Sequence, residues 1–149
     1  MASISVQSED FNIGDEIAAL KNDNNNVGAI VTFTGTVRDL GGSLEAMTLE
    51  HYPGMTEKEL ERIAGVAEDR WPLLGCRVIH RFGTLKPGDN IVLVVTLSAH
   101  RDAAFKAADF LMDFLKSNAP FWKKEQTAED ESWVASKQSD VSALNKWEK

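Results

Sequence analysis

The spacing of apolar residues along the chain predicts an α-helix near its start and a second one in its middle. Apolar side chains recur at helical intervals in residues 13–20 and in residues 60–71. Thr56 and Glu59 have the spacing of a capping box, which indicates that the second helix begins at Thr56. Pro72 prevents that helix from continuing.

A third helix is expected after the longest apolar run of the chain. Residues 91–97 are continuously apolar, which is typical of a strand buried in the centre of a sheet. Asp102 is a suitable N-cap, and helical spacing continues from there to about Asn118, before Pro120.

The remaining strand candidates are short and are bounded by turn-forming residues. Further strands are expected at residues 27–37, 46–52 and 77–82, with turns at residues 41–42 and 86–89. From residue 126 the tail is polar, with Trp133, Val134, Leu144 and Trp147 as candidate anchors. Helices and strands alternate irregularly, so the sequence predicts a mixed α+β fold over a doubly wound parallel sheet.

Size and charge narrow the class of protein. The 149 residues suit a single domain spanning 1–149, and the lone cysteine, Cys76, excludes an internal disulfide framework. A net charge of -7 argues against a nucleic-acid partner. The N-terminal residues resemble no secretory signal, and no apolar run is long enough to span a membrane, so a cytoplasmic protein without membrane contact is expected.

Common catalytic fingerprints are absent from the sequence. It contains no dinucleotide-binding glycine motif, no phosphate-binding P-loop and no serine nucleophile elbow. His51, His80 and His100 do not have the spacing of metal ligands. We therefore expect neither a metal nor another resident cofactor.

Basic residues gather around the third helix. His100 and Arg101 precede it, Lys116 lies in its last turn, and Lys123 follows shortly after, while Arg38 ends the first long strand. Arginine forks and lysine ammonium groups suit phosphate. A lysine held near other cations, or removed from water, has a lowered pKa and can act as a base or nucleophile. This pattern favours an anion-binding site with a working lysine.

Each of these residues also has a structural interpretation. Lys116 is favoured at a helix C-terminus by the helix dipole, and Arg101 has Asp102 and Glu125 as possible ion-pair partners. Phe121 and Trp122 are more often core or interface residues than ligand-stacking groups. The Cys76 thiol is expected to be a small buried apolar group rather than a nucleophile.

Four segments resemble a known family in the order of its signatures. Residues 31–38, 49–55, 98–101 and 119–125 are similar to conserved strings of the molybdopterin synthase large-subunit family, MoaE, and the resemblance runs from about Phe11 to Trp147. It implies an α/β hammerhead fold with an additional antiparallel β subdomain.

The resemblance also implies an activity. Large subunits of this family form a homodimer within a heterotetramer, in which each copy binds the small ubiquitin-like subunit MoaD. The thiocarboxylated Gly-Gly terminus of MoaD supplies sulfur to cyclic pyranopterin monophosphate (precursor Z), and two transfers create the dithiolene of molybdopterin.

The resemblance assigns roles to individual residues. Lys116 and Lys123 match catalytic lysines, and Arg38, His100 and Arg101 match residues that hold the substrate phosphate. The other matched residues are Thr36, Val37, Lys124 and Glu125 as substrate-binding residues, and Phe33 and Met112 as pocket walls.

Two positions depart from the family pattern. Thr36 stands where a lysine is frequent, and Lys137 stands where many members have an arginine that reaches the substrate of a neighbouring subunit. Lysine keeps the charge but loses the bidentate fork. The alternative hypothesis is a non-catalytic module that binds a ubiquitin-like protein tail or a phosphorylated small molecule.

Overall fold

The computed structural model of the protein contains two four-stranded sheets among its described residues. It describes residues 2–39, 42, 44–117, 121–127, 131–134 and 147. The first sheet has the order β1 (Ser3–Gln7), β4 (Leu73–Arg81), β6 (Asn90–Ser98), β2 (Ala29–Thr36), and the second β5 (Gly83–Leu85), β3 (Leu44–His51), β7 (Phe121–Thr127), β8 (Glu131–Val134). The helices are α1 (Ile13–Lys21), α2 (Met55–Arg70) and α3 (Arg101–Ser117).

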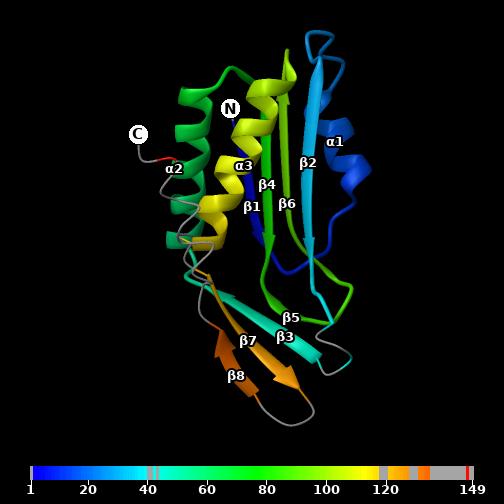
Figure 1. Ribbon diagram of the computed structural model, residues 1–149, viewed down its shortest axis with the longest axis vertical. Helices are drawn as coiled ribbons and strands as arrows, with labels where there is room; N and C mark the ends of the chain where they lie inside the picture. The colour runs from blue at the N-terminus through cyan, green and yellow to red at the C-terminus, as the bar shows by residue number, and fades with distance from the viewer. Residues whose placement is uncertain are drawn as a thin grey trace.

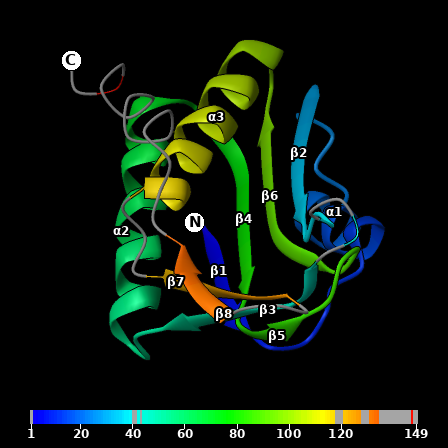
Figure 2. The same cartoon turned by 60° about the horizontal axis from the view of Figure 1, so that its bottom comes forward.

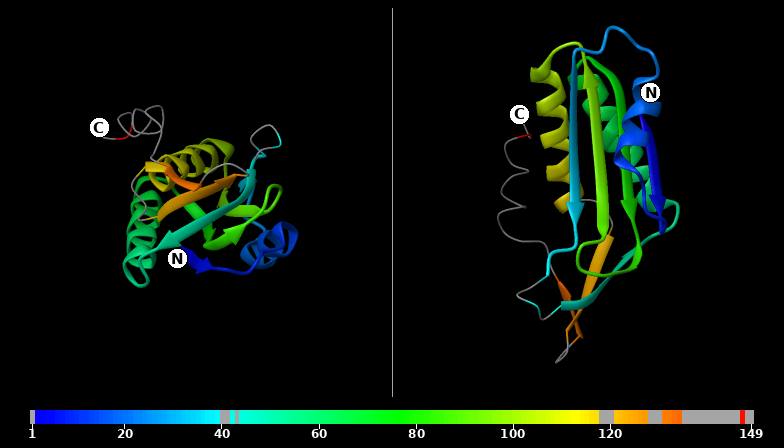
Figure 3. Two further views of the ribbon diagram at one scale, coloured as in Figure 1. Left: turned by 90° about the horizontal axis from the view of Figure 1, so that it is seen from below. Right: turned by 90° about the vertical axis from the view of Figure 1, so that its right-hand side faces the viewer.

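Helices cover both faces of the first sheet. Helices α2 and α3 lie on one face and α1 lies on the other (Figures 1 and 3). Strand β6 pairs antiparallel with both β4 and β2, while β1 joins β4 in parallel. Residues 92–98 of β6 are all buried, so the predicted central strand is confirmed. The other predicted strands are also observed, with shifted ends, and the mixed α+β class is confirmed.

Small side chains let α3 lie close to the sheet. Ala103, Ala104 and Ala107 are buried, and Thr96 of β6 donates a hydrogen bond from Oγ1 to the Ala104 carbonyl at 2.7 Å. This bond satisfies a hydroxyl that would otherwise be costly to bury. Strand β6 and α3 are therefore held together just below the turn that joins them.

The second sheet is entirely antiparallel and has a small core of its own. Figure 2 shows it crossing beneath the first sheet. Its strands pair β5 with β3, β3 with β7, and β7 with β8. Its core consists of Val37, Leu44, Met47, Leu49 and Leu85. This is the additional antiparallel sheet that the family resemblance implied.

The predicted anchor Trp147 packs against the two large helices. Its indole contacts Trp71 and Phe110 edge-on, and its Nε1 donates a hydrogen bond to Asp113. Arg70 donates to the Trp147 carbonyl at 3.1 Å. Of the other candidate anchors, Trp133 and Val134 belong to β8, and Leu144 lies outside the described residues.

Two predicted helix starts were wrong. Helix α2 begins at Met55, because Gly54 adopts a positive φ of 85° and its N–H is capped by the Glu57 carboxylate. Thr56 is already inside the helix, where its Oγ1 accepts a hydrogen bond from the Tyr52 N–H. Helix α3 begins at Arg101, so Asp102 lies in its first turn rather than at its cap.

Four strands were not predicted: β1, β5, β7 and β8, the last of which lies in the tail where the sequence indicated only anchor residues. Strand β1 has five residues and β5 has three, so each is too short for a clear pattern of apolar and polar positions to emerge. Strand β7 includes a run of polar residues, which lacks the apolar alternation of a half-buried strand. Among the described residues, no helix is long and apolar enough to cross a membrane.

Candidate active site

Helix α3 separates the predicted cations into two groups. Arg101 is its first residue and Lys116 lies in its last turn. With a rise of 1.5 Å per residue, the two positions are about 22 Å apart along the helix axis. The two side chains therefore extend from opposite ends of the helix.

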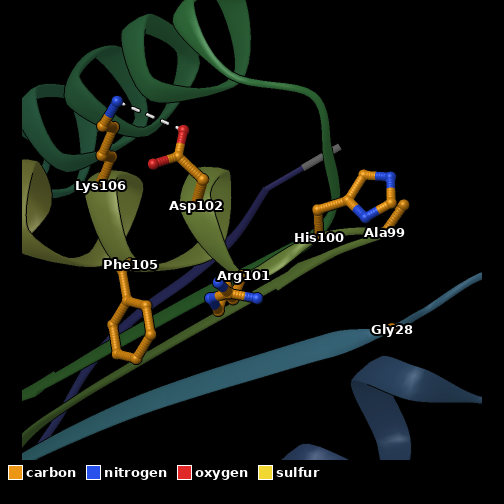
Figure 4. A pocket seen from close by; sticks show the side chains of 7 residues that line it. All are labelled: Gly28, Ala99, His100, Arg101, Asp102, Phe105 and Lys106. Carbon is orange, nitrogen blue, oxygen red and sulfur yellow. Dashed lines mark ion pairs between the residues drawn. The ribbon is translucent and has the colours of Figure 1, made fainter.

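A pocket of about 610 Å³ lies at the start of α3. Its lining comprises Gly28, Ala99, His100, Arg101, Asp102, Phe105 and Lys106. The side chains of Arg101 and Phe105 lie on the side of α3 nearest β2 (Figure 4). The free N–H groups at a helix N-terminus favour an anion, and Arg101 adds a full positive charge beside them. The pocket is therefore suited to a phosphate.

In this pocket Asp102 pairs with Lys106, whereas the sequence had suggested Asp102 as a partner of Arg101. Asp102 Oδ2 lies 3.2 Å from the Lys106 ammonium, one helical turn further along α3 (Figure 4). Because this carboxylate is engaged by Lys106, the Arg101–Asp102 pair is not what the structure shows. His100 is exposed, which argues against a buried structural role for it.

Gly28 is required by the close packing beside this pocket. A Cβ atom at this position would lie 2.2 Å from the Ala99 carbonyl oxygen, a backbone atom that cannot rotate away. The Gly28 N–H also donates to the Ser98 carbonyl at 3.0 Å. The glycine thus lets the start of β2 lie directly against the turn that carries His100 and Arg101.

The opposite end of α3 brings Lys116 close to a buried histidine. His80 is 8% exposed at the end of β4, and its Nδ1–H donates to the Arg81 carbonyl at 2.8 Å. Burial, together with the nearby charges of Lys116 and His51, lowers the pKa of His80 to about 4, against the opposing effect of the Arg81 hydrogen bond. The imidazole is therefore neutral at physiological pH.

The segment that carries the second predicted lysine also begins at this end. Phe121, the first residue of β7, stacks on the His80 ring with centroids 3.7 Å apart and planes at 19°. The β7 backbone then pairs Lys123, Lys124 and Glu125 with Leu49, Thr48 and Met47 of β3. Lys116 and the start of the Lys123-bearing strand are thus both adjacent to His80.

Strand β2 ends at Thr36, on the side of the molecule toward which α3 also runs (Figure 1), and Arg38 follows two residues later in the chain. It is exposed, as is Thr36, whereas Val37 between them is 4% exposed within the second core. The Val37 N–H donates to the Asp89 carbonyl, and its own carbonyl accepts from Gly88, both at 2.8 Å. These two bonds hold the backbone that presents Arg38.

The two predicted wall residues lie on the α3 side of the first sheet. Phe33 pairs with Val94, whose side chain belongs to the core beneath α2 and α3, and paired residues point to the same face. Met112 of α3 packs against that core. Phe33 is 41% exposed and Phe105 is 60% exposed, so β2 and α3 both present an aromatic ring to the surface.

Sequence patterns indicated His100 as a candidate site residue and indicated no role for His80. The available signal was its place in an apolar strand, next to Val78 and Ile79, which marks a buried imidazole. Cys76 is fully buried, and burial raises the pKa of its thiol to about 12, so the predicted inert cysteine is confirmed. Lys137 lies outside the described residues.

In the described part of the chain, no three histidine, cysteine, aspartate or glutamate side chains converge as metal ligands. Positively charged side chains lie instead at both ends of α3, and the pocket lies at the start of this helix. These features define a small α+β domain with a pocket suited to a phosphorylated ligand at the start of α3 and the exposed Lys116 at the end of that helix.

Comparison with known proteins identifies the family. The sequence model of the family described as MoaE protein matches residues 6–118. A molybdopterin synthase catalytic subunit from Brucella melitensis biotype 1 is 55% identical over 148 residues, covering 98% of this chain and 91% of the relative. The chain therefore belongs to the MoaE family. Both the predicted family and the predicted enzyme class are confirmed.

Solved structures agree with this assignment. The molybdopterin biosynthesis MoaE protein from Burkholderia ambifaria MC40-6 superposes with a TM-score of 0.85 at 50% identity, covering 99% of this chain and 98% of that chain. A protein–protein complex of subunits 1 and 2 of the molybdopterin-converting factor from Helicobacter pylori 26695 shares the fold, with a TM-score of 0.72 at 19% identity and 89% coverage of both chains.

Proposed function

We propose that this chain, as the catalytic subunit of molybdopterin synthase, transfers sulfur from the thiocarboxylated C-terminus of the small subunit MoaD to cyclic pyranopterin monophosphate. Family membership supports the reaction class, and the two-subunit complex from Helicobacter pylori supports a small-subunit partner. The choice of a phosphorylated substrate rests on the basic pocket at the start of α3, where helix N–H groups and Arg101 favour a phosphate.

The separation of Arg101 from Lys116 supports a site built from two copies of the chain. About 22 Å along α3 separates these two residues within one chain. The exposed rings of Phe33 and Phe105, on adjacent elements, offer apolar surface for a second copy. We therefore propose a homodimer within a heterotetramer, in which His100 and Arg101 of one copy act with Lys116 and Lys123 of the other.

The proposed chemistry needs two steps for each sulfur. The thiocarboxylate sulfur attacks a side-chain carbon of the pterin, and the C–O bond at that carbon breaks as the C–S bond forms. The oxygen leaves as water or as a freed phosphate oxygen, and the small subunit is then linked to the substrate through an acyl–sulfur bond. Water then attacks the acyl carbon, so that sulfur stays on the pterin and the small subunit leaves with a terminal carboxylate. Lys116 and Lys123 stabilise the negative charge that develops and transfer protons, and Glu125 orients a lysine or accepts a proton.

The remaining matched residues have supporting roles in this proposal. Arg38 binds the phosphate end of the substrate together with His100 and Arg101. Since Val37 is buried and both its backbone groups are engaged, it contributes by presenting Arg38. Thr36 and Lys124 complete the substrate-binding surface, Phe33 and Met112 wall the pocket, and Lys137 reaches a neighbouring site. The unit that acts is the whole of residues 1–149, in the cytoplasm.

A mixing assay tests the proposal. The purified chain is incubated with cyclic pyranopterin monophosphate and thiocarboxylated small subunit, and molybdopterin formation is followed. Product is expected only with the thiocarboxylate, and not with a small subunit that lacks its last two glycines. Binding of the small subunit or of precursor without product would instead support the alternative, a non-catalytic binding module. Equal turnover with free sulfide and with the small subunit would contradict the mechanism.

A further inference from the structure

The junction between the two sheets contains a cluster of rings that no catalytic role accounts for. His80 of β4 stacks on Phe121 of β7, with ring centroids 3.7 Å apart. His51 of β3 lies 6.3 Å from Phe121 and 4.3 Å from Phe82, centroid to centroid. His51 is in turn tied to α2, because its Nε2 lies 3.6 Å from Glu57 Oε1.

The His80–Phe121 stack connects elements that have no common hydrogen-bonded sheet. Strand β7 pairs only with β3 and β8 in the described residues, whereas β4 belongs to the first sheet. Phe121 is the first residue of β7, and Lys116 is five positions before it in the last turn of α3. The stack therefore fixes the first residue of the strand that carries Lys123, four positions after the last residue of α3.

The chemistry of His80 suits this place beside Lys116. Its ring is buried, and its Nδ1–H is committed to the Arg81 carbonyl at 2.8 Å, which sets the orientation of the imidazole plane. A neutral imidazole tolerates the ammonium group of Lys116 nearby, whereas a positively charged side chain of the same size would repel it. The surrounding titratable groups are Lys116 from α3 and His51 from β3, with Glu57 of α2 paired to His51.

We propose that His80 is a positioning residue of the sulfur-transfer site, whose buried ring, stacked on Phe121, sets the position of Lys116 relative to the Lys123-bearing strand β7. The inference rests on the proposed function. His80 is not a catalytic residue, because its only role is to place the segments that carry the two lysines. Small displacements of catalytic groups carry large rate costs, of about 100-fold for 1 Å.

Two substitutions separate the ring contact from the hydrogen bond. His80→Asn keeps a donor near the Nδ1 position but removes the ring, and His80→Phe keeps the ring but removes the donor. With kcat and KM measured in the mixing assay and corrected for the folded fraction, His80→Asn is expected to lower kcat by about ten-fold or more. KM for the pterin precursor should stay within about two-fold, because the residues proposed to hold the phosphate, Arg38, His100 and Arg101, are not among the described contacts of His80. His80→Phe should keep kcat within about three-fold of wild type.

Phe121→Leu provides the matching change on the other ring, and a test if His80→Asn does not fold. It should reproduce the loss of kcat, and the double variant should lose no more than either single variant, because both remove the same contact. Trp71→Phe, in the separate ring cluster at Trp147, is the control and should leave kcat unchanged.

The outcomes distinguish this inference from the function on which it rests. Wild-type chain that makes no molybdopterin would overturn the proposed function and this inference with it. Active wild type with an unchanged kcat in folded His80→Asn or Phe121→Leu would overturn the inference alone. So would an equal loss of kcat in His80→Phe and His80→Asn, because the ring would then not be the feature that matters.

Discussion

The indole ring of Trp147 meets that of Trp71 edge-on, with centroids 5.8 Å apart and planes at 88°. Because Trp71 ends α2 and Trp147 lies near the C-terminus, this contact fastens the end of the chain to the helical layer. Edge-to-face packing is a favoured geometry for aromatic rings. The same indole also packs against Phe110 and hydrogen-bonds to Asp113 of α3, so it contacts both large helices.

Trp147→Ala is expected to lower the free energy of unfolding by about 2–4 kcal/mol, because it removes the ring contacts and the hydrogen bond to Asp113 together. Urea unfolding followed by circular dichroism measures the change. Trp147→Phe keeps a ring and should recover part of the loss. Unfolding midpoints that are identical in wild type and Trp147→Ala would show that the C-terminal contact does not stabilise the fold.

His80 should make the stability of the protein depend on pH between about 6.5 and 4. Folding lowers the pKa of His80 to about 4 from 6.5, so the unfolded chain takes up a proton in this range and the folded chain does not. Its stabilisation is fully present above pH 6.5 and is lost as the pH falls toward 4. Between pH 7 and pH 5 the loss is about 2 kcal/mol.

Urea unfolding of wild type and His80→Phe at pH 7 and pH 5 isolates this contribution from the other titrating groups. The wild type should lose more stability than the variant on acidification. If both proteins lose the same free energy, the buried imidazole does not resist protonation as the structure requires.

Gly28→Ala should disturb the start of β2, because the added Cβ would lie 2.2 Å from the Ala99 carbonyl oxygen. The expected cost is roughly 1–3 kcal/mol of unfolding free energy. Since His100 and Arg101 follow Ala99 directly, KM for the pterin precursor should rise as well. Gly65→Ala in α2 is the matched control, because its Cβ would meet nothing within 4 Å.

The control should be neutral or stabilising by up to about 1 kcal/mol, since alanine favours a helix over glycine. Thermal unfolding and kinetics on both variants give the comparison. A Gly28→Ala protein with wild-type stability and KM would contradict the close approach of β2 to the turn.

Lys116→Ala is expected to lower kcat by about 100-fold or more, as removal of a group that stabilises transition-state charge does. Binding of the small subunit and the unfolding midpoint should change little, because Lys116 is exposed on the last turn of α3. Lys58→Ala, an exposed lysine on α2, serves as the control with unchanged kcat. Turnover that survives in Lys116→Ala would remove this lysine from the catalytic role.

A mixture of two inactive variants tests whether the site spans two copies. Arg101→Ala and Lys116→Ala chains are unfolded together, refolded and assayed. If each site combines Arg101 of one copy with Lys116 of the other, mixed dimers contain one intact site, and about a quarter of wild-type activity returns. A site confined to one chain would remain damaged in every copy, and no activity would return.

The sequence predicted what depends on short-range pattern. Helical spacing in residues 13–20 and 60–71, and the apolar run of residues 91–97, were sufficient for three elements and the α+β class. Four short motifs were sufficient for the family. The polar strand β7 was missed, because its place is determined by pairing with β3 rather than by its own residues.

By itself, then, the sequence determined the three helices, four of the strands, the family and the chemistry available, since these reside in local spacing and residue type. Only the tertiary structure decided that α3 holds Arg101 and Lys116 about 22 Å apart. It also decided that His80, unremarkable in the sequence, stacks on Phe121 where the two sheets meet. Both relationships arise from the length of a helix and the packing of residues distant along the chain, which no local pattern records.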